Sequence, residues 1–299
     1  RYCQTTTKNL VKRENTDTLE IIPGYDAPSS WWEHVPIAHW LIKNIKPKLV
    51  VELGTHYGVS FFAFCESAEI YSEETFCYAV DTWEGDSQAG FYGNEVYEKV
   101  SQYFNDKHKT RGRLIRSTFD DAATHFDDNA IDLIHIDGLH TYEAVKHDYN
   151  TWLSKLKKGG TLMFHDWNVR EADFGVWKLW EEIKASGNFQ CIEIKNGHGL
   201  AIATKTVLKP EWHDELIKSL PILKTKGWLL DELRRTKNCL EASDKELAAR
   251  KKNEQTLATQ NNELKQQIIE LQKVLDIYKK GLLYRGIRKL IRKIKSITK

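Results

Sequence analysis

The sequence predicts an α/β domain with a mostly parallel sheet, followed by a long helical extension. Within residues 48–209, short apolar runs alternate with stretches of helical periodicity, and all six prolines lie outside this span. Strands that alternate with helices are typical of a parallel sheet covered by helices on both faces. From Leu229 onward Gly and Pro become rare and Leu recurs every seven residues, which is typical of an extended helix.

The apolar runs mark five expected strands, at 48–53, 76–80, 113–116, 131–136 and 161–164. Helices are expected at 31–44, 59–68 and 142–156. Two further runs flank the turn Asn196-Gly197 and predict a hairpin at 189–194 and 200–204. This hairpin would add an antiparallel edge to the sheet.

Composition excludes several classes of protein. The 299 residues include 10 Trp and 12 Tyr, too many aromatic residues for a largely disordered chain. The five Cys are odd in number and lack C-x-x-C spacing, which favours reduced intracellular thiols over a disulfide framework or a zinc site. No apolar run reaches the ~18 residues of a membrane span, and no signal peptide is visible. We therefore expect a cytoplasmic location.

The first chemical signal is a turn between a strand and a helix. Glu52 lies in the strand, and Gly54 and Gly58 bound the turn that follows. Glycine lets the backbone approach a ligand closely, and the N–H groups that begin the next helix suit a ligand carboxylate. Asp81 ends the next strand, where an acid can accept hydrogen bonds from ribose hydroxyls. The alternatives are a plain strand–helix turn and an acid that caps a helix.

Acids and histidines follow two later strands. Asp137 and His140 come after the fourth expected strand, and His165 and Asp166 come after the fifth. The carboxyl ends of parallel strands open onto the same crevice, so these four side chains can converge. Two carboxylates suit Mg²⁺ or Mn²⁺, and a histidine can act as a general base. The alternatives are an ordinary turn at Asp137, a buried histidine at His165 and a helix cap at Asp166.

Three motifs in this order resemble those of the class I S-adenosylmethionine-dependent methyltransferases, and among them the O-methyltransferases found with polysaccharide-biosynthesis enzymes. The motifs are Val51-Glu52-Leu53-Gly54-Thr55, Val80-Asp81-Thr82-Trp83-Glu84-Gly85-Asp86 with Gly90-Phe91-Tyr92-Gly93, and Ile136-Asp137-Gly138-Leu139-His140-Thr141-Tyr142. The resemblance covers residues 30–205 and implies a Rossmann-like sheet with an antiparallel C-terminal hairpin. It implies a cofactor site in which Glu52, Gly54 and Gly58 line the methionine end. Asp81 would hold the ribose, and Ser117 and Phe119 would lie beside the adenine.

The same region resembles metal-dependent O-methyltransferases of small molecules and macrolide sugars. This resemblance implies that Asp137 and Asp166 bind a divalent cation, Mg²⁺ or Mn²⁺, and that His140 is the general base. His165 stands where some relatives have an acid, and it is the expected third metal ligand. A bound cation would lower the pKa of an acceptor hydroxyl, whose proton the base would take.

We expect an N-terminal segment at 1–30 and the methyltransferase-like domain at 31–205. A coiled coil is expected further along the chain. The rest divides into a linker at 206–228, the coil at 229–282 and a basic amphipathic helix at 283–299. Two series carry the heptad pattern, and every member but one is apolar or aromatic. They are Leu257, Leu264, Leu271 and Tyr278, and Asn261, Ile268, Leu275 and Leu282. A polar residue such as Asn261 within the seam can fix register or oligomeric state. The alternative is a helix packed back on the domain.

The last segment is strongly basic. Residues 279–299 contain nine Lys and Arg and no acid, although the formal net charge of the whole chain is only +2. An apolar face combined with such charge is typical of a helix that lies on an anionic membrane surface. The alternatives are a solvated helix end and nucleic-acid binding, for which no motif is present. We expect peripheral association with the inner face of the membrane and no nucleic-acid partner.

The layout resembles bacterial polysaccharide chain terminators, in which a coiled coil that sets chain length follows a methyltransferase. This resemblance implies methyl transfer to a sugar hydroxyl of a cell-surface glycan, such as an O-antigen, which would cap the chain. It also implies a glycan acceptor, a homo-oligomer formed through the coil and a glycosyltransferase partner. Two alternatives stay open: methylation of a small metabolite or antibiotic sugar, and an assembly scaffold that has lost activity.

Overall fold

The structure is a computed structural model that describes residues 23–297. The chain divides into two compact units, Arg1–Arg234 and Arg235–Lys299. The first unit is built on a seven-stranded sheet, and the second consists of helix. The expected fold class, a Rossmann-like α/β domain followed by a long helix, is confirmed.

The main sheet has the strand order β5-β2-β1-β6-β7-β9-β8. Its strands are β1 (Leu49–Leu53), β2 (Phe76–Asp81), β5 (Gly112–Arg116), β6 (Ile131–Ile136), β7 (Leu156–His165), β8 (Gln190–Ile194) and β9 (Leu200–Thr204). The first five of these pair in parallel, whereas β9 runs antiparallel to both β7 and β8, as the predicted hairpin requires. The order reverses between β1 and β6, and open α/β sheets bind ligands in the crevice at such a reversal.

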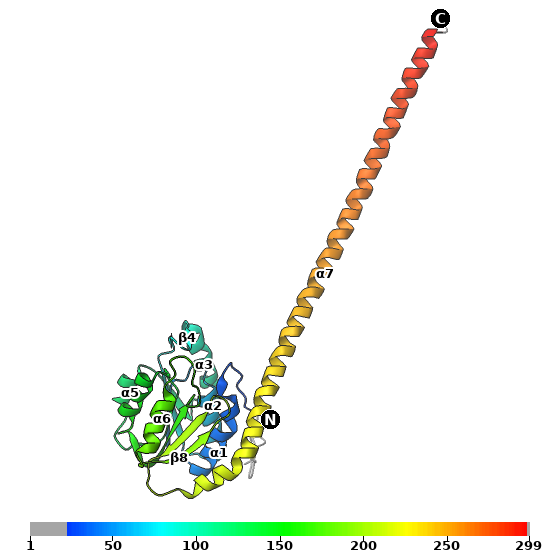
Figure 1. Cartoon of the computed structure of the whole chain (residues 1–299). Coiled ribbons are helices and arrows are strands. Elements are labelled where there is room, and N and C mark those ends of the chain that lie inside the picture. Colours follow the sequence, from blue (N-terminus) through cyan, green and yellow to red (C-terminus); the bar gives the residue numbers. More distant parts are fainter. Residues whose placement is uncertain (1–22, 298–299) are drawn as a thin grey trace, which may run out of the picture. The chain divides into compact units, whose positions relative to one another are not determined.

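Helices cover both faces of the sheet (Figure 1). One face carries η1 (Ser30–His34), α1 (Val35–Ile45), α2 (Val59–Tyr71), α3 (Asn94–Lys107) and the beginning of α7 (Glu211–Ile297). The other face carries α4 (Phe119–Ala123), α5 (Tyr142–Trp152) and α6 (Val176–Ala185). Each layer therefore has its own hydrophobic core against the sheet.

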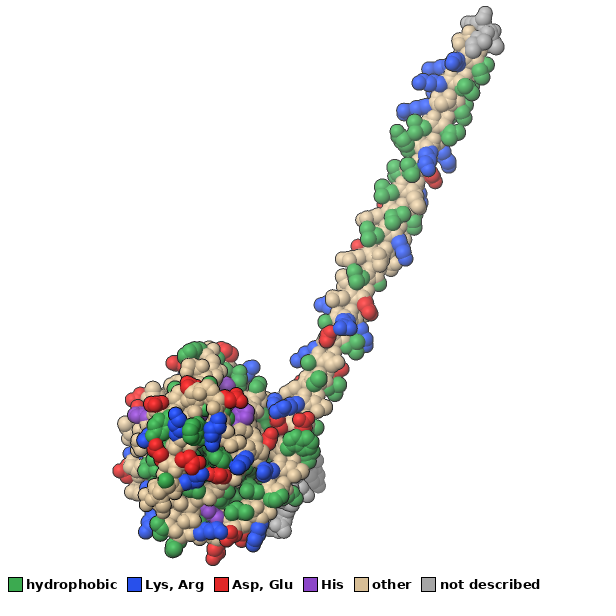
Figure 2. Space-filling model, viewed as in Figure 1, with side chains coloured by type: hydrophobic (Ala, Val, Ile, Leu, Met, Phe, Trp, Pro, Cys, Tyr) green, Lys and Arg blue, Asp and Glu red, His purple; other side chains and the backbone are tan. Residues whose placement is uncertain are grey.

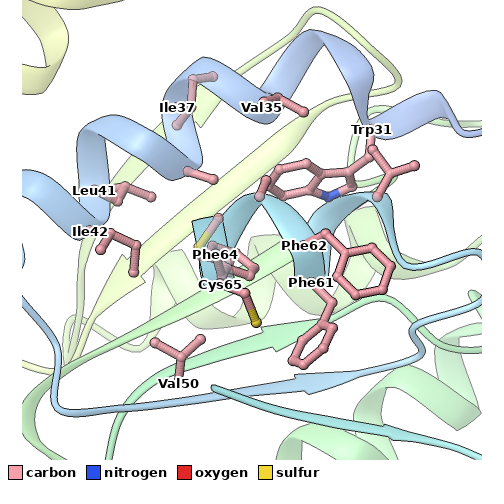
Figure 3. Packing of buried hydrophobic residues seen from close by; sticks show 14 of the residues in the cluster. Trp31, Val35, Ile37, Leu41, Ile42, Val50, Phe61, Phe62, Phe64 and Cys65 are labelled. Atoms are coloured by element: carbon pink, nitrogen blue, oxygen red, sulfur yellow. The ribbon is translucent and has the colours of Figure 1, made fainter. Parts of the chain in front are cut away.

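Successive side chains of β1 belong to the two different cores. Val50 packs in the cluster that contains Trp31 and Phe64, whereas Val51 and Leu53 belong to the cluster on the opposite face. Successive side chains of a strand point to opposite faces, so one short strand contributes to both cores. Figure 3 shows the first cluster, with side chains of η1, α1 and α2 gathered above the sheet. Full burial of a large apolar side chain stabilises the fold by roughly 1.5–3 kcal/mol.

Several elements were not expected from the sequence. The helices α3, α4 and α6 lie between the expected strands, and β3 (Gly85–Asp86) pairs with β4 (Gly90–Phe91) in a separate two-stranded ribbon. The buried side chains of α3 are only Val96, Val100 and Phe104. A helix with so few apolar residues gives a weak periodic signal, which explains why it was missed.

The helix α7 begins within the stretch that was expected to be a linker. Residues 206–228 are helical from Glu211 onward, although Pro221 lies inside the helix. Leu216 and Leu223 are buried in the core of the first unit. This packing stabilises a helix that the local sequence does not suggest, because tertiary contacts outweigh local propensity.

The second unit is the remainder of α7, whose apolar side chains are exposed along its length (Figure 2). In the expected seam, Ile268 is 53% exposed and Leu275 is 50% exposed. In a coiled coil a second helix would cover these side chains. The coiled coil stays a prediction. Within residues 23–297, no helix combines the length and the apolar composition that a bilayer crossing requires.

Candidate active site

A cavity of about 590 Å³ lies at the carboxyl ends of the parallel strands. Its wall comes from the turn after β1, the end of β2, the loop after β6 and the end of β7. Ten site residues were expected from the sequence. Those on the wall of this cavity are Gly54, Gly58, Asp81, Phe119, Asp137, His140, His165 and Asp166. Glu52 and Ser117 are not among them.

The turn after β1 requires glycine at two positions. Gly54 and Gly58 have φ angles of +86° and +84°, in the left-handed region. A Cβ on Gly54 would lie 2.1 Å from the carbonyl oxygen of Asp137, so the backbones of the two loops touch here. Thr55 Oγ1 is buried and has no hydrogen-bond partner among the described residues. The turn thus presents an unused hydroxyl and the first N–H groups of α2 to a ligand.

Asp81 has partners other than those expected. Its Oδ2 accepts hydrogen bonds from the backbone N–H groups of Thr55 and His56, both at 2.8 Å, and its Oδ1 accepts one from Trp83 N at 2.7 Å. A carboxylate can accept about four hydrogen bonds, so one position on Oδ1 is left for a ribose hydroxyl. Asp81 therefore holds the turn after β1 in place, in addition to lining the cavity.

Glu52 lies behind the cavity wall. Its side chain is fully buried, and its Oε2 accepts a hydrogen bond from Nδ1 of His135 at 2.9 Å. The two residues face each other across the paired strands β1 and β6. Because side chains alternate along a strand, Glu52 points toward the α1–α2 layer. Glu52 therefore lies behind the wall and not on it, and its role at the methionine end stays a prediction.

The two residues expected beside the adenine separate in the structure. Phe119 lies on the cavity wall, and its ring crowds Gly138, where an added Cβ would meet it at 2.6 Å. Ser117 instead uses its backbone N–H to donate to the carbonyl oxygen of Asp81 at 3.0 Å. The neighbouring Thr118 lines the cavity in its place. Ser117 is not on the cavity wall, and its place beside the adenine stays a prediction.

Two carboxylates and two imidazoles converge at the end of the cavity formed by β6 and β7. Nε2 of His140 lies 3.2 Å from Asp137 Oδ1 and 3.0 Å from Asp166 Oδ2. Nδ1 of His165 lies 3.3 Å and 3.2 Å from the same two oxygen atoms. Each carboxylate oxygen is thus shared between two rings. Residues almost 30 positions apart in the sequence meet because their strands are neighbours.

Opposite charges set the protonation of this cluster when no cation is present. Burial alone would lower the pKa of both histidines, but Asp137 and Asp166 raise it to about 9 for His140 and about 10 for His165. Burial alone would raise the pKa of the two carboxyl groups, but the histidines hold it well below its usual range. At neutral pH the cluster therefore consists of carboxylates and imidazolium ions.

Three of these side chains could hold a metal ion. One ligand atom each from Asp137, His140 and Asp166 lie within 4.8 Å of one another. Two carboxylates and one imidazole suit Mg²⁺ or Mn²⁺, and three protein ligands leave coordination positions for water and an acceptor oxygen. The expected set had His165 as the third ligand and His140 as the base. His165 also faces both carboxylates through Nδ1, but it is buried and its Nε2 has no partner among residues 23–296. Its place as a ligand stays a prediction.

Sequence reasoning missed His135, which supports the site from behind. Its Nε2 accepts a hydrogen bond from the indole N–H of Trp31 at 3.2 Å. The signal was present in the sequence, because Glu52 and His135 each interrupt an apolar strand. A polar side chain inside a buried strand needs a partner, and two such strands that pair can provide it for each other.

Comparison with known proteins identifies the type of domain. Residues 51–167 match the family model of a methyltransferase domain. The matched span includes the glycine turn, Asp81 and the Asp137–His140–Asp166 cluster, although it is less than half of the chain. The chain therefore carries a domain of the methyltransferase type.

A curated relative shares this part of the chain. It is described as uncharacterized protein y4gI of Sinorhizobium fredii, and it is 44% identical over 161 residues, which is 54% of this chain and 18% of that protein. The chain thus spans less than a fifth of the length of the curated relative it matches. This relative assigns no activity to the methyltransferase domain.

Solved structures of methyltransferases are similar to the domain at low identity. The methyltransferase PaMTH1 of Podospora anserina, bound to S-adenosylhomocysteine, is 14% identical with a TM-score of 0.45 and covers 60% of this chain and 88% of its own. The O-methyltransferase TomG of Streptomyces achromogenes, in complex with S-adenosylmethionine, is 11% identical with a TM-score of 0.45 and covers 62% and 83%. A likeness of this degree carries no argument about the reaction of this chain.

Proposed function

We propose that this chain is an S-adenosylmethionine-dependent O-methyltransferase that acts on a sugar hydroxyl. The observation that carries the proposal is that one cavity combines two chemically different ends. The end formed by Gly54, Gly58 and Asp81 suits a nucleoside with a carboxylate. The end formed by the Asp137–His140–Asp166 cluster suits a hydroxyl group that must lose its proton.

The residues at the first end would bind and orient the cofactor. S-adenosylmethionine, when bound, supplies a methyl group on a positively charged sulfur. The N–H groups that begin α2 and the unpartnered hydroxyl of Thr55 would hold its carboxylate end. The free position on Asp81 Oδ1 would accept from one ribose hydroxyl. The Asp137–His140–Asp166 cluster at the other end would act on the acceptor hydroxyl.

The contacts of His140 and its pKa in the metal-free chain bear on its two possible roles. A general base must be unprotonated. Burial lowers the pKa of His140, but the carboxylates of Asp137 and Asp166 outweigh burial and raise this pKa to about 9, so His140 is protonated at neutral pH in the metal-free chain. With Asp137 and Asp166, His140 would hold a divalent cation, which would lower the pKa of the acceptor hydroxyl so that its proton can pass to solvent water. His140 would bind as the neutral imidazole, with its Nε2 proton released to solvent. We therefore favour His140 as a ligand beside Asp137 and Asp166, and the role of base, which the sequence suggested, becomes the alternative.

The extension supports a large acceptor at a surface. The exposed heptad series in α7 supports a homo-oligomer of this chain formed through a coiled coil. A coil of fixed length would suit an enzyme that caps a cell-surface glycan such as an O-antigen. A glycosyltransferase would then be its partner. A small soluble metabolite or antibiotic sugar would need neither feature. Deletion of residues 262–268 removes one heptad and keeps the phase of the helix. It should change the length of the native glycan, measured by mass spectrometry, and an unchanged length would contradict capping.

The basic tail supports contact with an anionic membrane. At about 100° per residue, the exposed Ile287, Ile291 and Ile294 lie roughly half a turn away from the seam, whose continuation carries Arg285 and Lys289. A coil partner would therefore leave this apolar face uncovered. Vesicles that contain phosphatidylglycerol should retain the chain, and the double substitution Ile287→Ser and Ile291→Ser should release it. The seam variant Ile268→Ser is the control and should stay bound.

Binding and turnover test the central proposal separately. Calorimetry should detect binding of S-adenosylmethionine, and EDTA should abolish methyl transfer to a glycan fragment without preventing that binding. Asp166→Asn should lower turnover at least a hundredfold with little loss of cofactor affinity, whereas Asp120→Asn, at an exposed acid, should do neither. Absence of both binding and turnover would favour an assembly scaffold. Turnover that persists in EDTA and in Asp166→Asn would reject the metal ion.

A further inference from the structure

Gln88 connects the ribbon β3–β4 to His140. Its side-chain Oε1 lies 2.9 Å from the backbone nitrogen of His140 and 3.1 Å from Nδ1 of the same residue. Its Nε2 lies 2.7 Å from Oδ1 of Asp173, which precedes α6. One amide therefore touches two segments of the chain that are far apart in sequence, and it reaches the ring nitrogen of His140 that faces away from the carboxylates.

The polarity of its partners fixes the orientation of this amide. A backbone N–H can only donate a hydrogen bond, so the atom of Gln88 that faces His140 N must be the oxygen. A carboxylate can only accept, so the atom that faces Asp173 must be the nitrogen. The two contacts require the same orientation independently of each other. The oxygen and nitrogen of an amide are otherwise easily exchanged, but here the exchange would break both contacts.

The amide orientation in turn fixes the ring of His140. Oε1 of Gln88 accepts, so Nδ1 of His140 must carry a hydrogen and donate it. The other ring nitrogen, Nε2, is the one that lies between Asp137 and Asp166. A neutral imidazole with hydrogen on Nδ1 has its lone pair on Nε2, and this is the form that binds a metal ion through Nε2. Gln88 thus selects the tautomer that a cation between the two carboxylates needs.

Other contacts hold the ring of His140 against rotation. The ring of Phe174 stacks on it with a centroid distance of 5.0 Å and an interplanar angle of 9°. The backbone N–H of Gly175 donates to the carbonyl oxygen of His140 at 2.7 Å. Phe174 and Gly175 are the two residues after Asp173, so the segment that contacts the ring is the same segment to which Gln88 is hydrogen-bonded.

We propose that Gln88 is a positioning residue that orients His140 for metal binding and links this ligand to the ribbon over the cavity. The inference rests on the proposed metal centre at Asp137, His140 and Asp166. Gln88 itself would not touch the cation, the cofactor or the acceptor. Groups that hydrogen-bond to a metal-bound histidine typically change metal affinity by about 10–100-fold when they are removed.

Direct measurement of Mn²⁺ binding tests this without relying on methyl transfer. Gln88→Ala should weaken Mn²⁺ binding to the full-length chain about tenfold or more, measured by calorimetry or by the loss of the free-ion electron paramagnetic resonance signal. S-adenosylmethionine affinity should change less than twofold. Ser87→Ala, at the exposed neighbouring position, is the matched control and should bind Mn²⁺ like the wild type. Thermal unfolding of both variants shows whether the fold is retained.

An exchange of partners separates positioning from a general loss of contacts. Gln88→Glu keeps an acceptor for His140 but places a second carboxylate against Asp173, so Mn²⁺ binding should weaken. Adding Asp173→Asn restores a donor opposite the new carboxylate, and the double variant should recover Mn²⁺ binding to within threefold of the wild type. A merely structural role for Gln88 would not produce this recovery.

The outcomes are distinguishable. Wild-type affinity in Gln88→Ala, or failure of the double variant to recover, would overturn the positioning role while leaving the metal centre intact. A wild-type chain that does not bind Mn²⁺ would overturn the metal centre and this inference together, whereas cofactor binding would still be judged by its own calorimetry. Weakened binding in Gln88→Ala with recovery in the double variant is the result that the structure predicts.

Discussion

Trp31 donates its indole N–H to Nε2 of His135 over a distance of 3.2 Å. The indole nitrogen can only donate, so Nε2 of His135 must carry its lone pair, and the ring hydrogen resides on Nδ1. Nδ1 then donates to Oε2 of Glu52 at 2.9 Å. This chain of buried polar groups joins η1 to β6 and β1 immediately before Asp137, so it supports the cavity floor without entering the cavity.

Trp31→Phe removes the donor and leaves Nε2 of His135 buried without it. We expect a loss of about 1–3 kcal/mol in the free energy of unfolding, beyond the effect of the smaller ring. Trp152→Phe is the matched control, because Trp152 is also fully buried but its indole nitrogen has no hydrogen-bond partner within the described part of the chain. Urea unfolding measures both variants, and equal losses would contradict the role of the hydrogen bond.

Gly54→Ala should damage the cofactor site by moving Asp137. The added methyl group would lie 2.1 Å from the carbonyl oxygen of Asp137, at a φ of +86°. Gly159→Ala is the control, since it has a similar φ of +79° but nothing within 4 Å of the added atom. Both variants bear a left-handed strain of about 1 kcal/mol. Only Gly54→Ala should weaken S-adenosylmethionine binding at least tenfold in calorimetry, and similar losses in both would show that strain alone matters.

Asp81→Asn tests whether Asp81 organises the turn after β1. An amide has one acceptor oxygen, so its NH₂ group must face a backbone N–H, and we expect cofactor affinity to fall about tenfold. Asp132→Asn is the control, because Oδ2 of Asp132 accepts from the N–H groups of Lys48 and Leu49, both at 2.9 Å, at the other end of β1. It should reduce stability comparably but leave cofactor affinity unchanged. The idea fails if both variants bind the cofactor equally well.

The fold could be predicted from the sequence where buried elements appear as nearly uninterrupted runs of apolar residues. The strands β1 and β6 are apolar runs that match the expected ranges within one residue, because a parallel strand buried on both faces has few polar positions. The helical start of α7 could not be predicted in the same way. Leu216 and Leu223 can be recognised as core residues only when the domain against which they pack is known.

The site could be predicted as a set of chain positions, but not as a set of side-chain directions. Parallel strands bring their carboxyl ends together, which was enough to place Asp137 and Asp166 in one cavity. Glu52 was expected on the cavity wall, but its position in β1 directs its side chain to the buried face of the sheet. The roles that we propose for His140 and His165 depend in the same way on ring directions, which are set by loop backbone that no motif specifies.

The histidine cluster should make the metal-free chain less stable at alkaline pH. Burial alone would lower the pKa of His140, but its two carboxylate partners raise it from about 6.5 to about 9 in the folded chain. A raised pKa gives stability that is fully present below pH 6.5 and is lost as the pH rises through 9. The pKa of His165 is raised to about 10 by the same carboxylates against the effect of burial, so the loss continues to that pH.

Urea unfolding between pH 6.5 and 9.5 in EDTA measures this effect. We expect the free energy of unfolding to fall by about 3 kcal/mol through His140, because one pKa unit corresponds to about 1.4 kcal/mol. His140→Asn should show a shallower decline than the wild type, since the remaining slope then belongs to His165. Excess Mg²⁺ should also flatten the wild-type profile, because a metal-bound imidazole has already lost its proton. Parallel profiles for all three samples would mean that His140 does not bear this charge.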